Sequence, residues 1–99
     1  MNIEFRRNGR ELTIIPGERI DTLTAPELDQ KLKAEVADAN VLIFDLVNVN
    51  YISSAGLRVL LFYAQEMMEM DGNVKAIHVN EYIRDIFDLA GFLEILNVD

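Results

Sequence analysis

The order of two apolar segments in the middle of the chain limits the fold more than any other feature. Val41-Leu42-Ile43-Phe44 is a continuous apolar run of strand length, typical of a strand that is covered on both faces. Residues 54–70 then carry apolar side chains at helical spacing. A buried strand followed by a long amphipathic helix favours an α/β domain, in which helices pack on a sheet.

The flanking regions extend this alternation of strands and helices. Residues 3–7 and 12–15 flank the turn signal Asn8-Gly9, so residues 3–15 are predicted to form a hairpin. Further elements are predicted as helices at 25–37 and 80–89, strands at 74–78 and 93–98, and a loop at 48–53. We therefore predict an α/β fold of order ββαβαβαβ, with a mixed sheet and packed helices. The 99 residues are expected to form a single domain, 1–99.

The predicted helix starts carry recognisable signals. Thr24 is a good N-cap, and Glu27 three residues later completes a capping-box pattern. Pro26 lies in the first turn, where its missing N–H costs little. At the end of the last helix, Gly91 follows as a typical C-terminal stop.

The helix at 54–70 has two distinct faces. Its predicted core face consists of apolar side chains, namely Leu57, Leu60, Leu61, Ala64, Met67 and Met68. Arg58 and Glu69 mark the opposite, polar side, and Phe62 falls in the middle of it, so Phe62 is predicted to be exposed. Single exposed apolar residues are common and usually carry no function. The alternative is a partner-docking surface, because Phe62 lies two turns from a serine pair.

The charge balance argues against two classes of partner. The chain carries 17 acidic and 9 basic residues, a formal net charge of -8, which disfavours nucleic acid and anionic membranes as partners. Two interpretations remain: the charge keeps the domain soluble, or the domain binds a protein partner. Without cysteine, neither a disulfide nor a thiolate metal site is possible. The N-terminal residues do not resemble a signal peptide, and no apolar run is long enough to span a bilayer, so a cytoplasmic protein is expected.

Enzyme signatures are scarce. The sequence has no P-loop, GxGxxG, HExxH or EF-hand pattern, and His78 has no nucleophile at a recognisable spacing. Asp21, Asp45 and Asp71 follow strands or turns and would form a metal site if they met at one sheet edge, although aspartate also favours turns. We predict no catalytic residue, metal or cofactor.

Ser53-Ser54 is the strongest functional candidate, because it lies where the long helix begins. A serine there can cap the helix by accepting a hydrogen bond from a free N–H group. The alternative to this more common role is that it carries a phosphate, which the helix N-terminus stabilises and which a kinase can reach. The residues alone leave both interpretations open.

The chain resembles a STAS domain of the kind found in bacterial anti-sigma-factor antagonists. The resemblance covers nearly the whole chain. It is carried by four segments, Asp21-Thr22-Leu23-Thr24-Ala25, Leu42-Ile43-Phe44-Asp45-Leu46, Val49-Asn50-Tyr51-Ile52-Ser53-Ser54-Ala55-Gly56-Leu57 and Phe87-Asp88-Leu89-Ala90-Gly91-Phe92.

The resemblance implies a phosphorylation site. In that family the acceptor serine lies two residues before the helix glycine, which assigns Ser54, with Ser53 as the alternative acceptor. Asp21 corresponds to an acidic residue near the acceptor. The chain departs from the family pattern at Ser53, where aspartate is frequent, and at Ala55, where a second serine or threonine is frequent.

The resemblance also implies a function by partner switching. The unphosphorylated protein would bind an anti-sigma factor that is also a serine kinase, phosphorylation of Ser54 would release it, and a serine phosphatase would reverse the modification. The predicted contact residues are Asp21, Ser53, Ser54, Arg58 and Phe62. Two alternatives stay open: a constitutive STAS adaptor in a signalling scaffold or transport complex, and a small-molecule or nucleotide-binding module.

Overall fold

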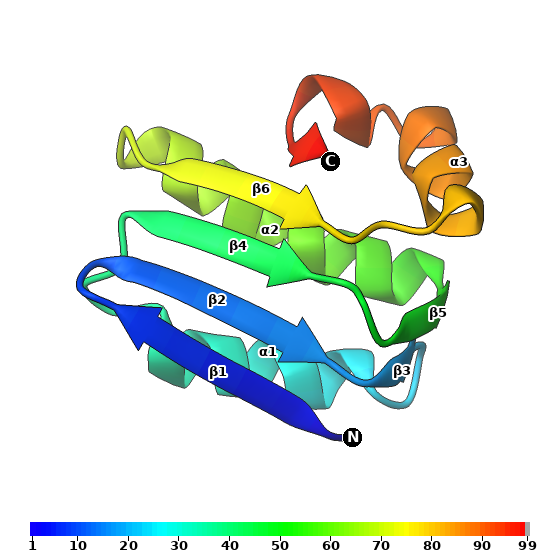
Figure 1. The fold of residues 1–99 in the computed structure, drawn as a ribbon, viewed down its shortest axis with the longest axis horizontal. Coiled ribbons are helices and arrows are strands. Elements are labelled where there is room, and N and C mark those ends of the chain that lie inside the picture. Colours follow the sequence, from blue (N-terminus) through cyan, green and yellow to red (C-terminus); the bar gives the residue numbers. More distant parts are fainter. Residues whose placement is uncertain (99) are drawn as a thin grey trace.

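The computed structural model describes residues 1–98, which form a five-stranded sheet, a separate pair of strands and three α-helices (Figure 1). The main sheet has the spatial order β1 (Ile3–Asn8), β2 (Glu11–Pro16), β4 (Val41–Asp45), β6 (Asn73–Ile77) and β7 (Asn97–Val98). The short pair is β3 (Glu18–Ile20) and β5 (Val49–Ile52). The helices are α1 (Ala25–Glu35), α2 (Ser54–Glu69) and α3 (Glu81–Leu89), and a 3-10 turn, η1, spans Phe92–Glu94.

The strand directions confirm the predicted mixed sheet. β1 and β2 are antiparallel and are joined by a tight turn at Gly9, whose φ of 63° suits glycine. The β2–β4, β4–β6 and β6–β7 pairs are all parallel. The carboxyl ends of the parallel strands therefore meet at one edge of the sheet, and α2 begins beside that edge (Figure 1).

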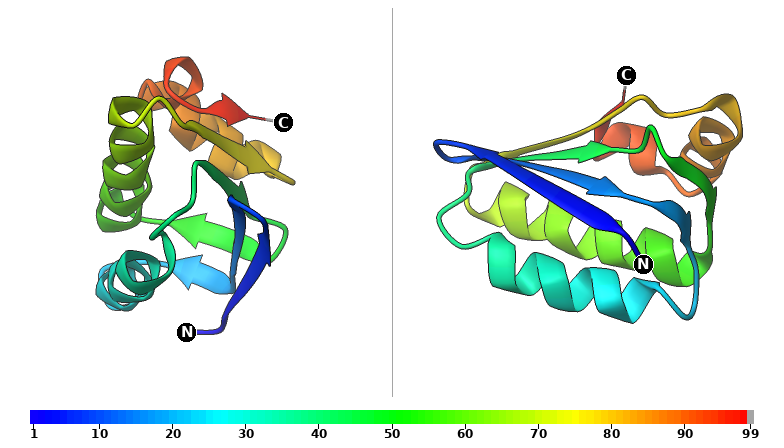
Figure 2. Two further views of the ribbon diagram at one scale, coloured as in Figure 1. Left: turned by 90° about the vertical axis from the view of Figure 1, so that its left-hand side faces the viewer. Right: turned by 60° about the horizontal axis from the view of Figure 1, so that its bottom comes forward.

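Helices α1 and α2 lie on the same face of the sheet, as both views in Figure 2 show. The core between these layers is made of fully buried side chains from both, including Leu12, Ile14, Leu42, Phe44, Leu28, Leu32, Leu60 and Ala64. α3 lies at the end of the sheet near β5, and its Phe87 ring packs 5.3 Å from that of Phe92 in η1.

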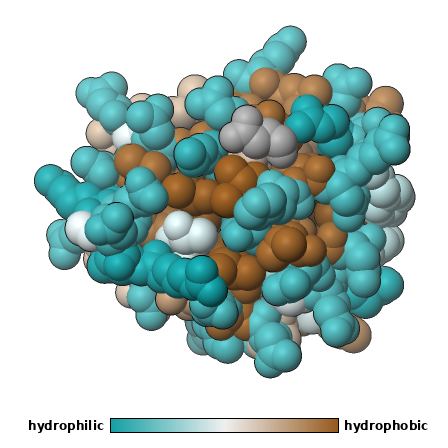
Figure 3. All heavy atoms as spheres, viewed as in Figure 1, coloured by the Kyte–Doolittle hydropathy of each residue, from teal (hydrophilic) through white to brown (hydrophobic). Residues whose placement is uncertain are grey.

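No helix in residues 1–98 covers the opposite face of the sheet. Figure 3 shows apolar side chains along the middle of this face, with hydrophilic ones around them. Ile15 and Ile43 are each only 7% exposed there. Their cross-strand neighbours, such as Glu4 beside Ile15 and Lys75 beside Ile43, flank them on the same face.

The predicted element order is wrong in two segments. Residues 49–52 were expected in a loop, but they form β5, which pairs in parallel with β3. Val49 and Ile52 are buried, and their spacing of three residues hides the alternation that marks a strand. The predicted strand at 93–98 is also wrong over most of its length, because Phe92–Glu94 form η1 and only Asn97–Val98 pair with β6.

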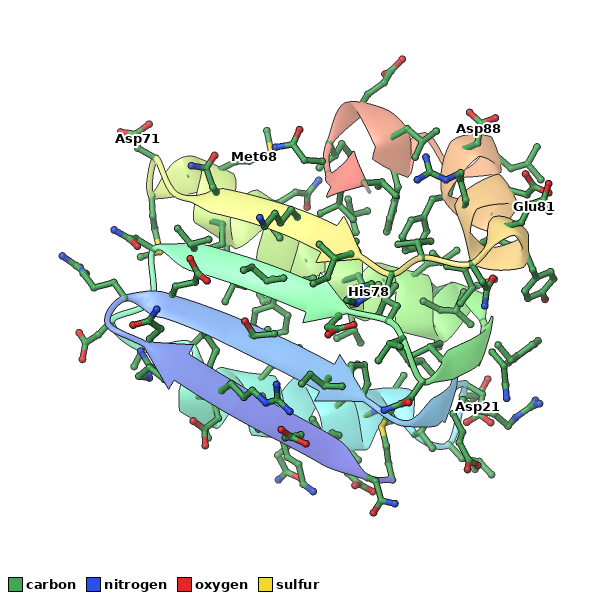
Figure 4. All side chains as sticks on the ribbon, in the orientation of Figure 1. Asp21, Met68, Asp71, His78, Glu81 and Asp88 are labelled. Atoms are coloured by element: carbon green, nitrogen blue, oxygen red, sulfur yellow. The ribbon has the colours of Figure 1, made fainter. Side chains whose placement is uncertain are left out.

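The core face of α2 differs from the prediction at two positions. Met68 is 55% exposed and lies on the outside of the helix (Figure 4), whereas Met67 is buried. Tyr63 is buried instead, with 3% of its surface exposed. The difference arises because α2 contacts α1 as well as the sheet, which turns its buried face toward Tyr63. Phe62 is 51% exposed, as predicted.

Candidate functional site

Ser53 is the N-cap of α2. Its backbone is extended, with φ of -94° and ψ of 174°, and its Oγ accepts a hydrogen bond from the Gly56 N–H at 3.3 Å. Its own N–H donates to the Ile20 carbonyl of β3 at 2.8 Å. The side chain is half-buried. Ser53 therefore fixes the start of the helix against the short strand pair.

Ser54 is the first residue of α2 and is exposed. Within residues 1–98 its hydroxyl makes no hydrogen bond. The structure thus separates the two roles that the sequence left open for the serine pair, since Ser53 caps the helix and the Ser54 hydroxyl is available to solvent. The first-turn N–H groups and the helix dipole favour negative charge at this position.

Gly56 allows the first turn of α2 to approach β3 closely. A Cβ at this position would lie 2.8 Å from the Ile20 carbonyl oxygen and 2.7 Å from its Cγ2. These distances are too short for any other residue without a shift of the backbone. The glycine therefore sets the position of Ser54 relative to the neighbouring strands.

Asp21 organises the loop before α1. Its Oδ1 accepts hydrogen bonds from the backbone N–H groups of Leu23 and Thr24, both at 3.0 Å. The Thr24 N–H and then the Leu23 N–H hold the pKa of Asp21 below its ordinary value, against the opposing effect of desolvation. Since Ile20 contacts both Ser53 and Gly56, this loop continues directly from the strand that supports the serines.

The predicted capping box at the start of α1 is wrong. Thr24 occupies the N-cap position, but its Oγ accepts from the Asp21 N–H at 2.8 Å and donates to the Arg19 carbonyl at 2.8 Å. Glu27 contacts the Met1 amino group at 3.3 Å and Lys31 at 3.5 Å. The threonine closes the loop rather than capping the helix.

Arg58 and Phe62 lie one and two turns further along α2, and both are exposed. They line a groove between α1 and α2, whose other lining residues are Asp29, Lys33, Val59 and Tyr63. The Tyr63 hydroxyl donates to the Asp29 carboxylate at 2.8 Å, and burial raises the pKa of the Tyr63 hydroxyl. The Phe62 ring meets the Tyr63 ring edge-on at 5.0 Å. The Tyr63–Asp29 hydrogen bond and the contact between the Phe62 and Tyr63 rings fix the side chains that line the groove.

The comparisons with known proteins identify the family of this chain. The family model for the STAS domain matches residues 2–99. The chain belongs to the STAS-domain family. BtrV of Bordetella bronchiseptica, a candidate anti-sigma factor antagonist, is 32% identical over 80 residues, which cover 80% of this chain and 69% of that relative.

Solved structures share the fold. An anti-sigma factor antagonist from Mycobacterium paratuberculosis has a TM-score of 0.86 at 23% identity, covering 98% of this STAS chain and 83% of that one. The Bacillus cell fate determinant SpoIIAA in its phosphorylated form has a TM-score of 0.79 at 12% identity, covering 99% and 91% of the two chains. At these identities the likeness concerns the fold alone.

The three aspartates considered for a metal site do not meet in this STAS domain. Asp21 and Asp71 lie at opposite ends of the molecule (Figure 4). Asp45 instead contacts His78, whose Nδ1 lies 2.9 Å from its Oδ1. Within residues 1–98, no three His, Cys, Asp or Glu side chains are grouped as a metal site would require. In the same part of the chain, no helix is both long and apolar enough to cross a membrane.

Sequence reasoning missed the contacts of the Arg19 side chain in β3. Its guanidinium lies 4.3 Å from the centre of the Tyr51 ring, and its Nε lies 3.4 Å from the Asp21 carboxylate. These contacts join β3, β5 and the Asp21 loop. Predicting these contacts would have required knowing that β3 pairs with β5. Segments as short as these do not reveal such a pairing in the sequence.

Proposed function

We propose that this STAS domain is an anti-sigma-factor antagonist that acts by partner switching. In its unphosphorylated form it binds an anti-sigma factor that is also a serine kinase, through the surface that begins at Ser54. Phosphorylation of Ser54 weakens this complex, and a serine phosphatase restores binding. The protein acts as a binding regulator and not as an enzyme.

The proposal rests on the exposed hydroxyl of Ser54, which makes no hydrogen bond to any of residues 1–98. Because Ser53 already caps α2, Ser54 is not required for the helix start and is accessible to a kinase. The role of acceptor therefore suits Ser54 better than Ser53, whose Oγ is engaged and half-buried. The name of BtrV and the phosphorylated form of SpoIIAA support the same type of function.

The remaining predicted contact residues belong to α2 and to the loop before α1. Arg58 and Phe62 offer a cation and an aromatic ring on the same helix, and Asp21 shapes the loop that continues from β3. A phosphate on Ser54 would add a charge of about -1.5 to -2 to this surface. This charge would weaken partner binding by about 1–3 kcal/mol, or about 5- to 150-fold in affinity.

The decisive experiment compares unmodified protein with protein that carries phosphoserine at position 54. Each form is immobilised and exposed to extract from the native cells, and a captured serine kinase is then purified and its affinity measured by calorimetry. We expect tight binding of the unmodified protein and of Ser54→Ala, and at least fivefold weaker binding of the phosphorylated form. Ser53→Ala serves as the matched control and should bind like the wild type.

Equal affinity of all four forms would refute the switch and leave a constitutive adaptor. Mass spectrometry of the protein from its native cells provides a second criterion. We expect phosphate at Ser54 under some growth condition. Phosphate at Ser53 alone would instead identify the N-cap residue as the acceptor.

A further inference from the structure

An arginine without an ion pair lies one helical turn from the proposed acceptor. Ser54 and Arg58 are both exposed on α2. Within residues 1–98 Arg58 makes neither a salt bridge nor a side-chain hydrogen bond, in contrast to Arg19, which contacts Asp21 and Tyr51. The guanidinium nearest along the helix to Ser54 is therefore available for a new partner.

The spacing of the two residues suits such a contact. Residues four apart on a helix are neighbours on its surface, and helical side chains lean toward the N-terminus, so this spacing puts Ser54 within reach of the Arg58 side chain. An anion that precedes a cation by four residues is also the favoured order. A guanidinium matches a phosphate with two parallel hydrogen bonds.

Arg58 also belongs to the groove between α1 and α2. It lines that groove together with Phe62, and Lys33 contributes a second cation from α1. Whatever changes the position of the Arg58 side chain therefore changes the charge that the groove presents. Arg58 therefore lies between the start of α2 and the groove on the same helix.

Building on the partner switch proposed above, we propose that Arg58 is the internal ligand of a phosphate on Ser54. Phosphorylation draws the guanidinium toward the start of α2 and away from the groove beside Phe62. The modification then acts twice on a docking partner, by adding negative charge at Ser54 and by withdrawing a cation from the groove.

The test uses protein with phosphoserine incorporated biosynthetically at position 54 and follows its ³¹P NMR signal against pH. A nearby guanidinium favours the dianion and lowers the second pKa of the phosphate, which is about 6 in its absence. We expect Arg58→Gln to raise this pKa by about 0.3–0.7 units, a two- to fivefold change in proton affinity. The Nε–H signal of Arg58 should also shift on phosphorylation.

Lys33→Gln is the matched control, because it removes the same charge from the same groove and lies on a different helix. It should change the phosphate pKa by less than about 0.2 units. An equal effect of Arg58→Gln and Lys33→Gln, or a larger effect of Arg19→Gln, would overturn the proposal. Because the phosphate is installed during synthesis, the result does not depend on a kinase, so it fails or succeeds separately from the proposed function.

Discussion

The two adjacent serines should differ sharply in what their hydroxyls contribute to stability. Ser53→Ala removes the hydrogen bond from the Gly56 N–H, which at 3.3 Å is longer than the usual 2.9–3.0 Å. The loss should therefore fall in the lower half of the range for N-caps, at about 0.5–1 kcal/mol. For a domain of this size, that corresponds to a decrease in Tm of about 2–8 °C.

Ser54→Ala should leave stability almost unchanged. The Ser54 side chain is exposed, and its hydroxyl makes no hydrogen bond within residues 1–98. Alanine is also the better helix former, so any change should stay within about 0.3 kcal/mol and tend toward stabilisation.

Thermal and urea unfolding, followed by circular dichroism, would measure both variants against the wild type. Ser53→Gly is the informative control, because glycine is tolerated at an N-cap and should cost only about a few tenths of a kcal/mol. If Ser54→Ala costs as much as Ser53→Ala, the assignment of cap and free hydroxyl is incorrect.

Three further predictions concern the surroundings of the serines. Gly56→Ala should destabilise by about 1–3 kcal/mol in urea unfolding, because its Cβ would lie 2.8 Å from the Ile20 carbonyl oxygen. Tyr63→Phe should cost about 1–2 kcal/mol in the same assay, because it removes the 2.8 Å hydrogen bond to Asp29. Asp21→Ala should be less stable than the wild type at neutral pH. Hydrogen bonds hold the pKa of Asp21 below its ordinary value of 3.8, so this difference should persist above pH 4 and vanish as the pH falls through the lowered pKa.

The strongly patterned elements were predictable from the sequence. The apolar run at 41–44 forms the central strand β4, and the turn at Asn8-Gly9 closes the β1–β2 hairpin as expected. The boundaries of α2 and α3 agree with the predictions to within one residue. In each case local pattern and tertiary packing favour the same structure, which makes the sequence signal reliable.

The parts that were not predicted depend on contacts between distant residues. β3 and β5 are short, and each becomes a strand only by pairing with the other. Thr24 has the right identity and place for a cap, but the Asp21 N–H and the Arg19 carbonyl bind its hydroxyl instead. Met68 has the right spacing for the core, but α1 reorients the buried face of α2 toward Tyr63. Local propensity does not contain this information.

The rigid setting of Ser54 determines how a phosphate could act there. The chain before it is held by the Ser53–Ile20 backbone hydrogen bond, and Gly56 packs the following turn against the same strand. A phosphate on the exposed hydroxyl would meet no buried group, and the helix N-terminus favours its charge, so nothing drives a change of fold. In the proposed switch the signal would therefore lie in the surface itself, in added negative charge and in the position of cations such as Arg58. A partner that binds this surface can be released without a change in the sheet or in the packing of α1 and α2.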